Sequence, residues 1–176
     1  MARSGDTFVN AVTGFTLRFV KTSADTDGQL LEVEATYPPQ GVAPPAHFHP
    51  RQEEHFEVLR GAVRVRFAGE IRDLHAGEVL VVPPGVPHAM WNATGEEASV
   101  RWQTRPALRT EDFFVRLMIL AKLGRVNASG APGLLDAAVL FRMHQAEVRL
   151  ASPPERVQRL VFGVLAPVAR ALGRAN

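Results

Sequence analysis

Apolar side chains recur at every second position through much of the first 105 residues. The alternating runs are Phe15–Phe19, Leu31–Ala35, Val63–Phe67 and Val100–Trp102. Successive side chains of a strand point to opposite faces of its sheet, so this period of two is typical of antiparallel strands with one buried face. Glycine and proline interrupt the runs about every 8–12 residues, a spacing that favours a sandwich or barrel of short strands.

After residue 105 the spacing of apolar residues becomes helical. A first helix is predicted with Thr110 as its N-cap and with its end before Gly124. A second is predicted from about Leu134 to Leu150, and a third after the Ser-Pro-Pro-Glu segment at 152–155, which places proline near the first helical position. We therefore expect about three helices at the C-terminal end of the chain.

The third predicted helix is amphipathic, with a kink expected at Pro167. Arg156, Arg159, Arg170 and Arg174 line its polar side. An apolar stripe of this kind is usually buried, so we expect it to pack on the barrel or on a second subunit. Binding to a membrane surface or a partner is less favoured, because only four arginines line the polar side and no tryptophan anchors it. The stripe consists of Val157, Leu160, Val161, Val164, Leu165, Val168 and Leu172.

Charge divides the chain in the same place as the hydrophobic period. Residues 1–105 carry 10 basic and 13 acidic residues, a net of −3, whereas residues 106–176 carry 10 basic and 5 acidic residues, a net of +5. We therefore predict a β-barrel over 1–105 and a helical extension over 106–176. The total of +2 makes a nucleic-acid partner unexpected, and the lack of cysteine excludes disulfides and thiol chemistry. With no visible signal peptide or spanning segment, we expect a cytoplasmic protein.

Histidines and one glutamate form two motifs of fixed spacing. Because His47 and His49 are two residues apart, they share one face of a strand, and Glu54 and His88 are predicted to point to the same interior. Three imidazoles and a carboxylate suit one divalent transition metal ion (Fe, Mn, Ni or Zn), with positions left for water or substrate. The motifs are Gly41-x5-His47-x-His49-x4-Glu54-x6-Gly61 and Gly77-x5-Pro83-x-Gly85-x2-His88-x3-Asn92.

Together the two motifs resemble the two sequence signatures of the cupin superfamily. The resemblance covers roughly residues 31–104 and implies a double-stranded β-helix, a jelly-roll barrel, so the fold class becomes mainly β with an α-helical C-terminal extension. It implies that the glycines and Pro83 form turns and that Asn92 ends a strand. Cupins commonly pair their barrels, so it also implies a homodimer. The ligands implied by the resemblance are His47, His49, Glu54 and His88.

Other residues near these motifs have competing interpretations. Glu53 could replace Glu54 as a ligand, but alternation turns it outward. His55 is also expected to face outward, and His75 and His144 are expected to be surface or structural groups. Trp91 is expected outside the barrel, beneath a helix of the extension. Three further side chains, predicted either to line a pocket or to form plain barrel core, are Phe56, Met90 and Trp102.

The sequence leaves two functions open. The complete ligand set favours a metal-dependent enzyme, a dioxygenase-type oxidoreductase acting on a small and fairly apolar organic molecule. The scarcity of a separate acid or base favours a non-catalytic sensor or carrier that binds a metal or small molecule. Tyr37, the one tyrosine, is the best candidate for such a catalytic group, because it shares the inward parity of Leu31, Val33 and Ala35.

Overall fold

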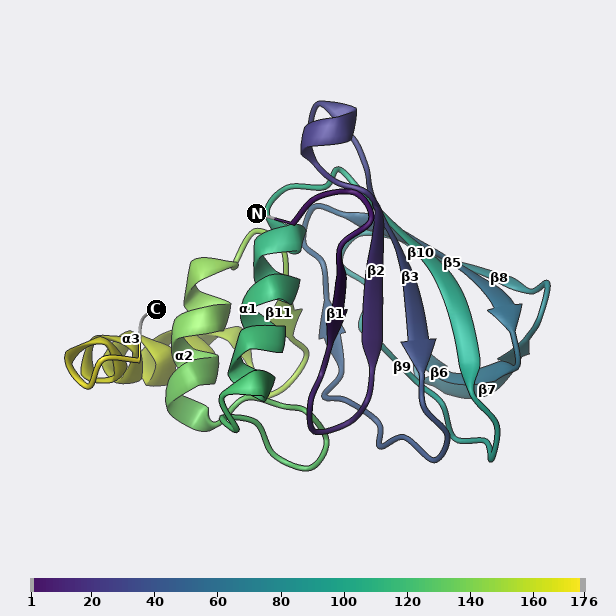
Figure 1. The fold of residues 1–176 in the computed structure, drawn as a ribbon. Helices are drawn as coiled ribbons and strands as arrows, with labels where there is room; N and C mark the ends of the chain where they lie inside the picture. The colour runs from purple at the N-terminus through teal and green to yellow at the C-terminus, as the bar shows by residue number, and fades with distance from the viewer. Residues whose placement is uncertain (1, 175–176) are drawn as a thin grey trace.

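Two antiparallel sheets face each other beside a group of helices in the computed structural model, which describes residues 2–174 (Figure 1). The first sheet contains, in spatial order, β1 (Thr7–Val9), β2 (Thr16–Lys21), β3 (Leu31–Tyr37), β10 (Ala98–Arg105), β5 (Glu53–Arg60) and β8 (Val79–Val82). The second contains β11 (Arg149–Leu150), β4 (His47–Phe48), β9 (His88–Trp91), β6 (Ala62–Phe67) and β7 (Glu70–His75). A short 3-10 helix, Ala24–Thr26, and the helices α1 (Thr110–Lys122), α2 (Leu134–Met143) and α3 (Glu155–Ala171) complete the fold. The predicted fold class is confirmed.

Alternation along the strands builds the main core between the sheets. Val100 of β10, for example, lies opposite Ala35 of β3 and Val58 of β5, and all three side chains are buried. The turn from β5 to β6 requires Gly61, whose φ is +71° and whose added Cβ would lie 2.7 Å from a backbone oxygen. The core consists of Phe56, Val58, Val63, Val65, Leu74, Leu80, Val82, Met90, Ala98 and Val100.

A second core joins the helical extension to the barrel. Phe114 and Met118 of α1 pack on the inward-facing side chains of β2 and β3, and Ala107 lies in the same cluster. In Figure 1, α1 stands beside β1 and β2, with α2 on its far side. The side chains from the barrel that α1 helps to cover are Leu17, Phe19, Leu31, Val33 and Ala35.

Two details of the predicted helices are wrong. The second helix ends at Met143 rather than Leu150, and the chain then turns so that Arg149–Leu150 becomes β11, paired with β4. Thr110 is the first residue of α1 rather than its N-cap. Its hydroxyl oxygen instead accepts a hydrogen bond from the buried amide of Gln52, 2.7 Å away. In both places the chain contacts the barrel near the boundary of the element.

The stripe on α3 does not pack on the barrel for most of its length, whereas its packing on a second subunit stays a prediction. Small residues on another side of the helix, Ala166 and Ala169, pack against Ala138 and Val139 of α2. This close approach turns Leu160, Val164 and their neighbours outward, and both side chains are more than half exposed. The helix continues through Pro167.

Candidate metal centre

Three histidines converge between the two sheets. His47 lies in β4, His49 directly follows that strand, and His88 opens β9, where it pairs in register with His47. Their ring centroids are 4.6 to 5.4 Å apart. One ring nitrogen from each histidine lies within 4.8 Å of the other two. The predicted meeting of these three side chains is therefore what the structure shows.

Each imidazole is oriented by a backbone carbonyl on its outer side. Nδ1 of His49 lies 2.7 Å from the carbonyl oxygen of Glu147, Nδ1 of His88 lies 3.1 Å from that of Val86, and Nδ1 of His47 lies 3.3 Å from that of Pro45. A carbonyl oxygen can only accept, so Nδ1 carries the hydrogen in each ring. Nε2 of each neutral ring then presents a lone pair, which is the form of histidine that binds metals.

Glu54 is fully buried beside two of these nitrogens. Its Oε1 lies 3.2 Å from Nε2 of His49, and its Oε2 lies 2.9 Å from Nε2 of His88. The distance of 2.9 Å is short enough for a hydrogen bond, but the angles are not those of one. Nε2 of His49, Nε2 of His88 and Oε2 of Glu54 therefore have no hydrogen-bond partner. Lone pairs facing a carboxylate repel unless a cation lies between them, so the donor set fits a metal ion.

The protonation states of Glu54 and His47 favour the same conclusion. Burial opposes the charge of Glu54, but His49 and His88 outweigh it and hold the pKa of Glu54 below its usual range. Burial likewise opposes a charge on His49, whereas Glu54 raises the pKa of that ring. Burial and the neighbouring rings His88 and His49 lower the pKa of His47 to about 3. At neutral pH the site therefore contains a carboxylate and a neutral His47, the protonation states that metal ligands require.

Comparison with known proteins places the barrel in a family. Residues 33–103 match the model of a family described as the cupin domain. Residues 33–103 of this chain form a cupin domain. A stretch of 59 residues is 44% identical to the oxidoreductase macE of Penicillium terrestre, and it spans 32% of this chain but only 22% of that oxidoreductase. The chain thus corresponds to about a fifth of that relative.

Two solved structures are similar to this chain over somewhat more than half of its length. A sugar phosphate isomerase of the cupin superfamily from Silicibacter pomeroyi is 17% identical, with a TM-score of 0.50 over 58% of this chain and 71% of that one. A cupin 2 conserved barrel domain protein from Salinispora arenicola is 22% identical, with a TM-score of 0.46 over 59% and 86% of the two chains. Within residues 2–174, no helix is long and apolar enough to cross a membrane.

The remaining acidic and histidine candidates lie away from the cupin interior or have structural partners. Glu53 is exposed, as alternation predicted, and His75 is a surface residue. His55 is half-buried on the outward side of β5, opposite Gln103 and Val81. His144 is fully buried at the end of α2, where Nε2 lies 3.1 Å from Oδ2 of Asp112. Its structural interpretation is confirmed.

Two further predictions concern residues of β9 and the loop that follows it. Asn92 ends the strand as expected, since its amide donates to the carbonyl oxygens of Tyr37 and Glu96 at 3.1 and 2.7 Å. The half-buried ring of Trp91 is covered by the guanidinium of Arg66, 5.8 Å from the ring centroid. An arginine from the neighbouring strand therefore takes the place in which we expected a helix.

The predicted pocket residues form part of the barrel core. Phe56 and Met90 are buried in the main core, and Trp102 packs 5.2 Å from the ring of Phe56. Trp102 has a second role that alternation alone did not indicate, because its indole Nε1 donates a 3.0 Å hydrogen bond to Oε1 of Glu54. This bond occupies one carboxylate oxygen and leaves Oε2 free.

Tyr37 lies half-buried at the junction of the two cores, with its ring 4.9 Å from that of Phe15. Burial and the negative charge of Glu54 raise the pKa of its hydroxyl. Tyr37 is therefore protonated at neutral pH and suited to donate a hydrogen bond rather than to act as a base. Its catalytic role stays a prediction.

The sequence analysis did not predict that the helical extension contacts the histidines. The carbonyl of Glu147 orients His49, and β11 pairs Leu150 with His47, so the extension supports two of the three histidines. Gln52, fully buried, donates through its amide to the carbonyl of Pro106 at 2.8 Å. Gln52 lies two residues from Glu54, so alternation could have predicted that it faces the interior. The contact from the carbonyl of Glu147 could not have been predicted, because every residue has a backbone carbonyl.

Proposed function

We propose that this cupin domain holds one divalent transition metal ion through Nε2 of His47, His49 and His88, with Oε2 of Glu54 as the fourth ligand atom. The observation that carries this proposal is the convergence of unpaired, buried donor atoms: Nε2 of His49, Nε2 of His88 and Oε2 of Glu54 have no hydrogen-bond partner. The carbonyl contacts on Nδ1 hold the rings in the tautomer that can ligate.

A metal bound to this set would supply Lewis acidity and coordination positions for dioxygen or a substrate oxygen. The chain itself contributes orientation and exclusion of water. Trp102 holds Glu54 by one oxygen, and the apolar ring of Phe56 lies beside the site, with its centroid 6.3 Å from that of His88. The protonated hydroxyl of Tyr37 is the candidate donor to a developing negative charge on a substrate.

We propose further that the protein is a metal-dependent oxidoreductase of the dioxygenase type that acts on a small, fairly apolar organic molecule. The similarity to the oxidoreductase macE supports this reaction class, although it covers only 59 residues. The apolar surroundings of the histidines support the polarity of the substrate. A homodimer in the cytoplasm, with Fe, Mn, Ni or Zn as the metal, remains our expectation.

A non-catalytic metal or small-molecule carrier is the second candidate. It is favoured by the packing of Phe56, Met90 and Trp102, which contribute to the core beside the histidines. It is also favoured by the raised pKa of Tyr37, which removes this residue as a general base.

Elemental analysis of protein purified without added metal tests the metal site. We expect about one metal ion per chain in the wild type and in the control His75→Ala, and a loss of metal in His47→Ala/His49→Ala. His75 is a suitable control because it is an exposed histidine of the same barrel. Equal, sub-stoichiometric metal in the wild type and the double variant would contradict the proposal.

A second experiment separates an enzyme from a carrier. The protein is loaded with Fe(II) without oxygen and exposed to nitric oxide, an analogue of dioxygen. An electron paramagnetic resonance signal of a nitrosyl complex shows an open coordination position and supports the oxidoreductase. Metal-loaded protein that gives no such signal supports the carrier.

A further inference from the structure

Helix α3 has two apolar faces, and only one of them is used within the chain. With about 100° per residue, Ala166 and Ala169 lie on the face that packs against α2, roughly 170° from a second apolar face centred near Val164. The side chains of this second face are between 45% and 71% exposed. They form the open stripe of α3: Val157, Leu160, Val164, Val168 and Leu172.

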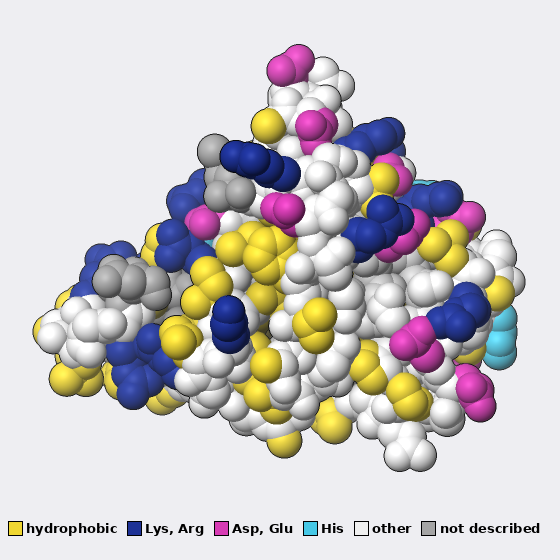
Figure 2. All heavy atoms as spheres, in the orientation of Figure 1, with side chains coloured by type: hydrophobic (Ala, Val, Ile, Leu, Met, Phe, Trp, Pro, Cys, Tyr) yellow, Lys and Arg dark blue, Asp and Glu magenta, His cyan; other side chains and the backbone are white. Residues whose placement is uncertain are grey.

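A row of arginines borders the open stripe of α3. Arg156 projects about 40° beyond Leu160 around the helix, and Arg159 and Arg170 lie behind it, whereas Arg174 follows the end of α3 and pairs with Asp136 of α2. In Figure 2, dark-blue basic side chains lie beside yellow apolar ones at the end of the molecule where Figure 1 places α3. The helix therefore combines an apolar strip with a cationic edge.

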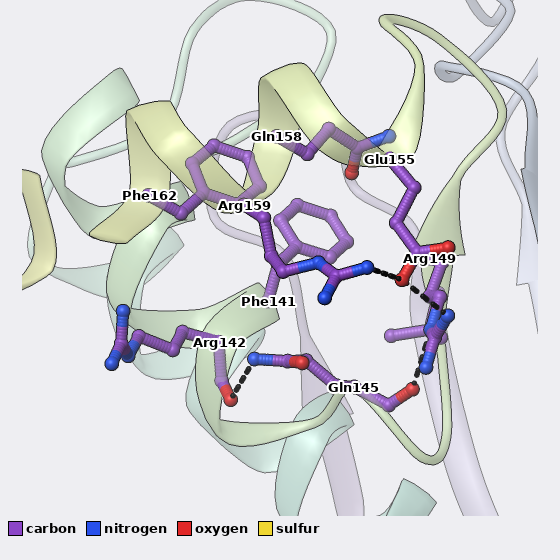
Figure 3. A pocket seen from close by; sticks show the side chains of 9 residues that line it. Phe141, Arg142, Gln145, Arg149, Glu155, Gln158, Arg159 and Phe162 are labelled. Atoms are coloured by element: carbon purple, nitrogen blue, oxygen red, sulfur yellow. Dashed lines mark hydrogen bonds and ion pairs between the residues drawn. The ribbon is translucent and has the colours of Figure 1, made fainter. Parts of the chain in front are cut away.

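Nearby acidic groups are already engaged. Glu155, the acidic residue of α3, contacts Arg149 at 3.0 Å and Arg159 at 3.3 Å (Figure 3). Asp136 of α2 is buried and binds both Arg125 and Arg174. Among residues 2–174, Arg156 and Arg170 form no ion pair, so the cationic edge has charge to offer to a partner.

Pairing with α3 of a second copy would leave the arginines beside the stripe without a counter-charge. If two copies of α3 paired antiparallel through their stripes about a two-fold axis, the same edge of each helix would meet, and one arginine row would face the other. A parallel pairing would direct the arginines toward α2 of the partner, whose one acidic residue is the engaged Asp136. Neither arrangement supplies a counter-charge.

We propose that α3 docks this protein on an anionic lipid surface, with the open stripe inserted among the acyl chains and the arginines at the headgroups. An anionic bilayer supplies both the apolar phase and the negative charge that this helix lacks within the chain. From the sequence we expected the stripe to be buried, and a membrane was disfavoured by the small number of arginines and the lack of a tryptophan anchor; the exposure of the stripe and the unpaired charges of Arg156 and Arg170 support the membrane instead. The helix lies outermost from the sheets, so docking leaves the cupin domain unobstructed (Figure 1).

Flotation with lipid vesicles tests the proposal on the full chain. The wild type should float with vesicles of phosphatidylcholine mixed with phosphatidylglycerol, should not float with phosphatidylcholine alone, and should be released by salt. Leu160→Glu/Val164→Glu should lose about tenfold or more of the partitioning. Ile71→Glu/Val42→Glu, the same change at exposed apolar residues of the barrel, should float like the wild type.

A second variant protects the test against misfolding. Arg156→Gln/Arg170→Gln leaves the apolar stripe intact and should also lose about tenfold of the partitioning. Circular dichroism and the metal content of each variant report on the fold. A wild type that does not float with anionic vesicles overturns the proposal. So does a wild-type dimer that Leu160→Glu/Val164→Glu converts to a monomer with unchanged vesicle binding, since this would assign the stripe to a second copy.

Discussion

Trp102→Phe is the change that most directly tests how the barrel holds its predicted carboxylate ligand. Trp102 donates from Nε1 to Oε1 of Glu54 at 3.0 Å, and its ring packs between Phe56 and Phe114 at centroid distances of 5.2 and 4.9 Å. Phenylalanine keeps an aromatic ring between these neighbours but has no N–H group. The substitution therefore removes the hydrogen bond and preserves most of the packing.

The size of the effect follows from the burial of Glu54, which is fully removed from solvent. A hydrogen bond to a charged group contributes about 1.5–3 kcal/mol. Loss of a group that orients a metal ligand weakens metal binding by about 10- to 100-fold. We expect Trp102→Phe to fall in this range, because Nε1 of Trp102 is the one hydrogen-bond donor to the Glu54 carboxylate among residues 2–174, and its loss leaves the carboxylate free to rotate.

The assay is a titration of metal-free protein with Zn²⁺ in competition with a coloured chelator, together with urea unfolding of the metal-free form. Trp91→Phe is the matched control, because Trp91 lies on the outward side of β9 against Arg66. An equal loss of affinity in both variants, or an unchanged Kd in Trp102→Phe, would refute the role of the indole. A lower free energy of unfolding with an unchanged Kd for Zn²⁺ would show that Trp102 contributes only to packing.

Two other predictions concern the helical extension. Deletion of residues 107–176 removes Phe114 and Met118 from the second core and the carbonyl of Glu147 from His49, so the truncated barrel should aggregate and lose its metal, as light scattering and elemental analysis can show; a soluble, metal-bound barrel would contradict this. Burial opposes the charge of Asp112, but Arg116 and His144 outweigh it and hold the pKa of this carboxyl below its usual value. A lowered pKa stabilises the fold above the unfolded value of about 3.9, and the contribution is lost as the pH falls through the folded pKa. Asp112→Asn should therefore lower the free energy of unfolding by about 1 kcal/mol at neutral pH and leave it almost unchanged near pH ~2. An equal loss at both pH values in urea unfolding would argue against the charge.

Local sequence patterns predicted many of the strands of the barrel and the orientation of its histidines. A period of two indicates which side chains of a strand share a face, and it correctly placed Glu54 inside and Glu53 outside. The two-residue spacing of His47 and His49 predicted that both would face the same site, and they do. These inferences succeed because strand geometry relates neighbours in sequence without regard to the rest of the fold.

In the helical extension, local patterns predicted the helices but not their packing or their ends. Amphipathicity identified α3 as a helix with an apolar side, but an apolar stripe does not indicate what covers it. In the structure α3 packs on α2 through the small residues Ala166 and Ala169 instead. The helix predicted to continue to Leu150 ends early, because β4 offers an open edge to which β11 can pair. Competition of this kind is decided by partners distant in sequence.

By itself, the sequence determined the class of fold, the residues facing the barrel interior and the chemical nature of a His and Glu donor set. Only the tertiary structure decided that the helical extension supports this site and leaves one face of α3 open. The contact that orients His49 comes from a carbonyl 98 residues away. Every residue has a carbonyl, so its position in space, and not its identity, makes it part of the site.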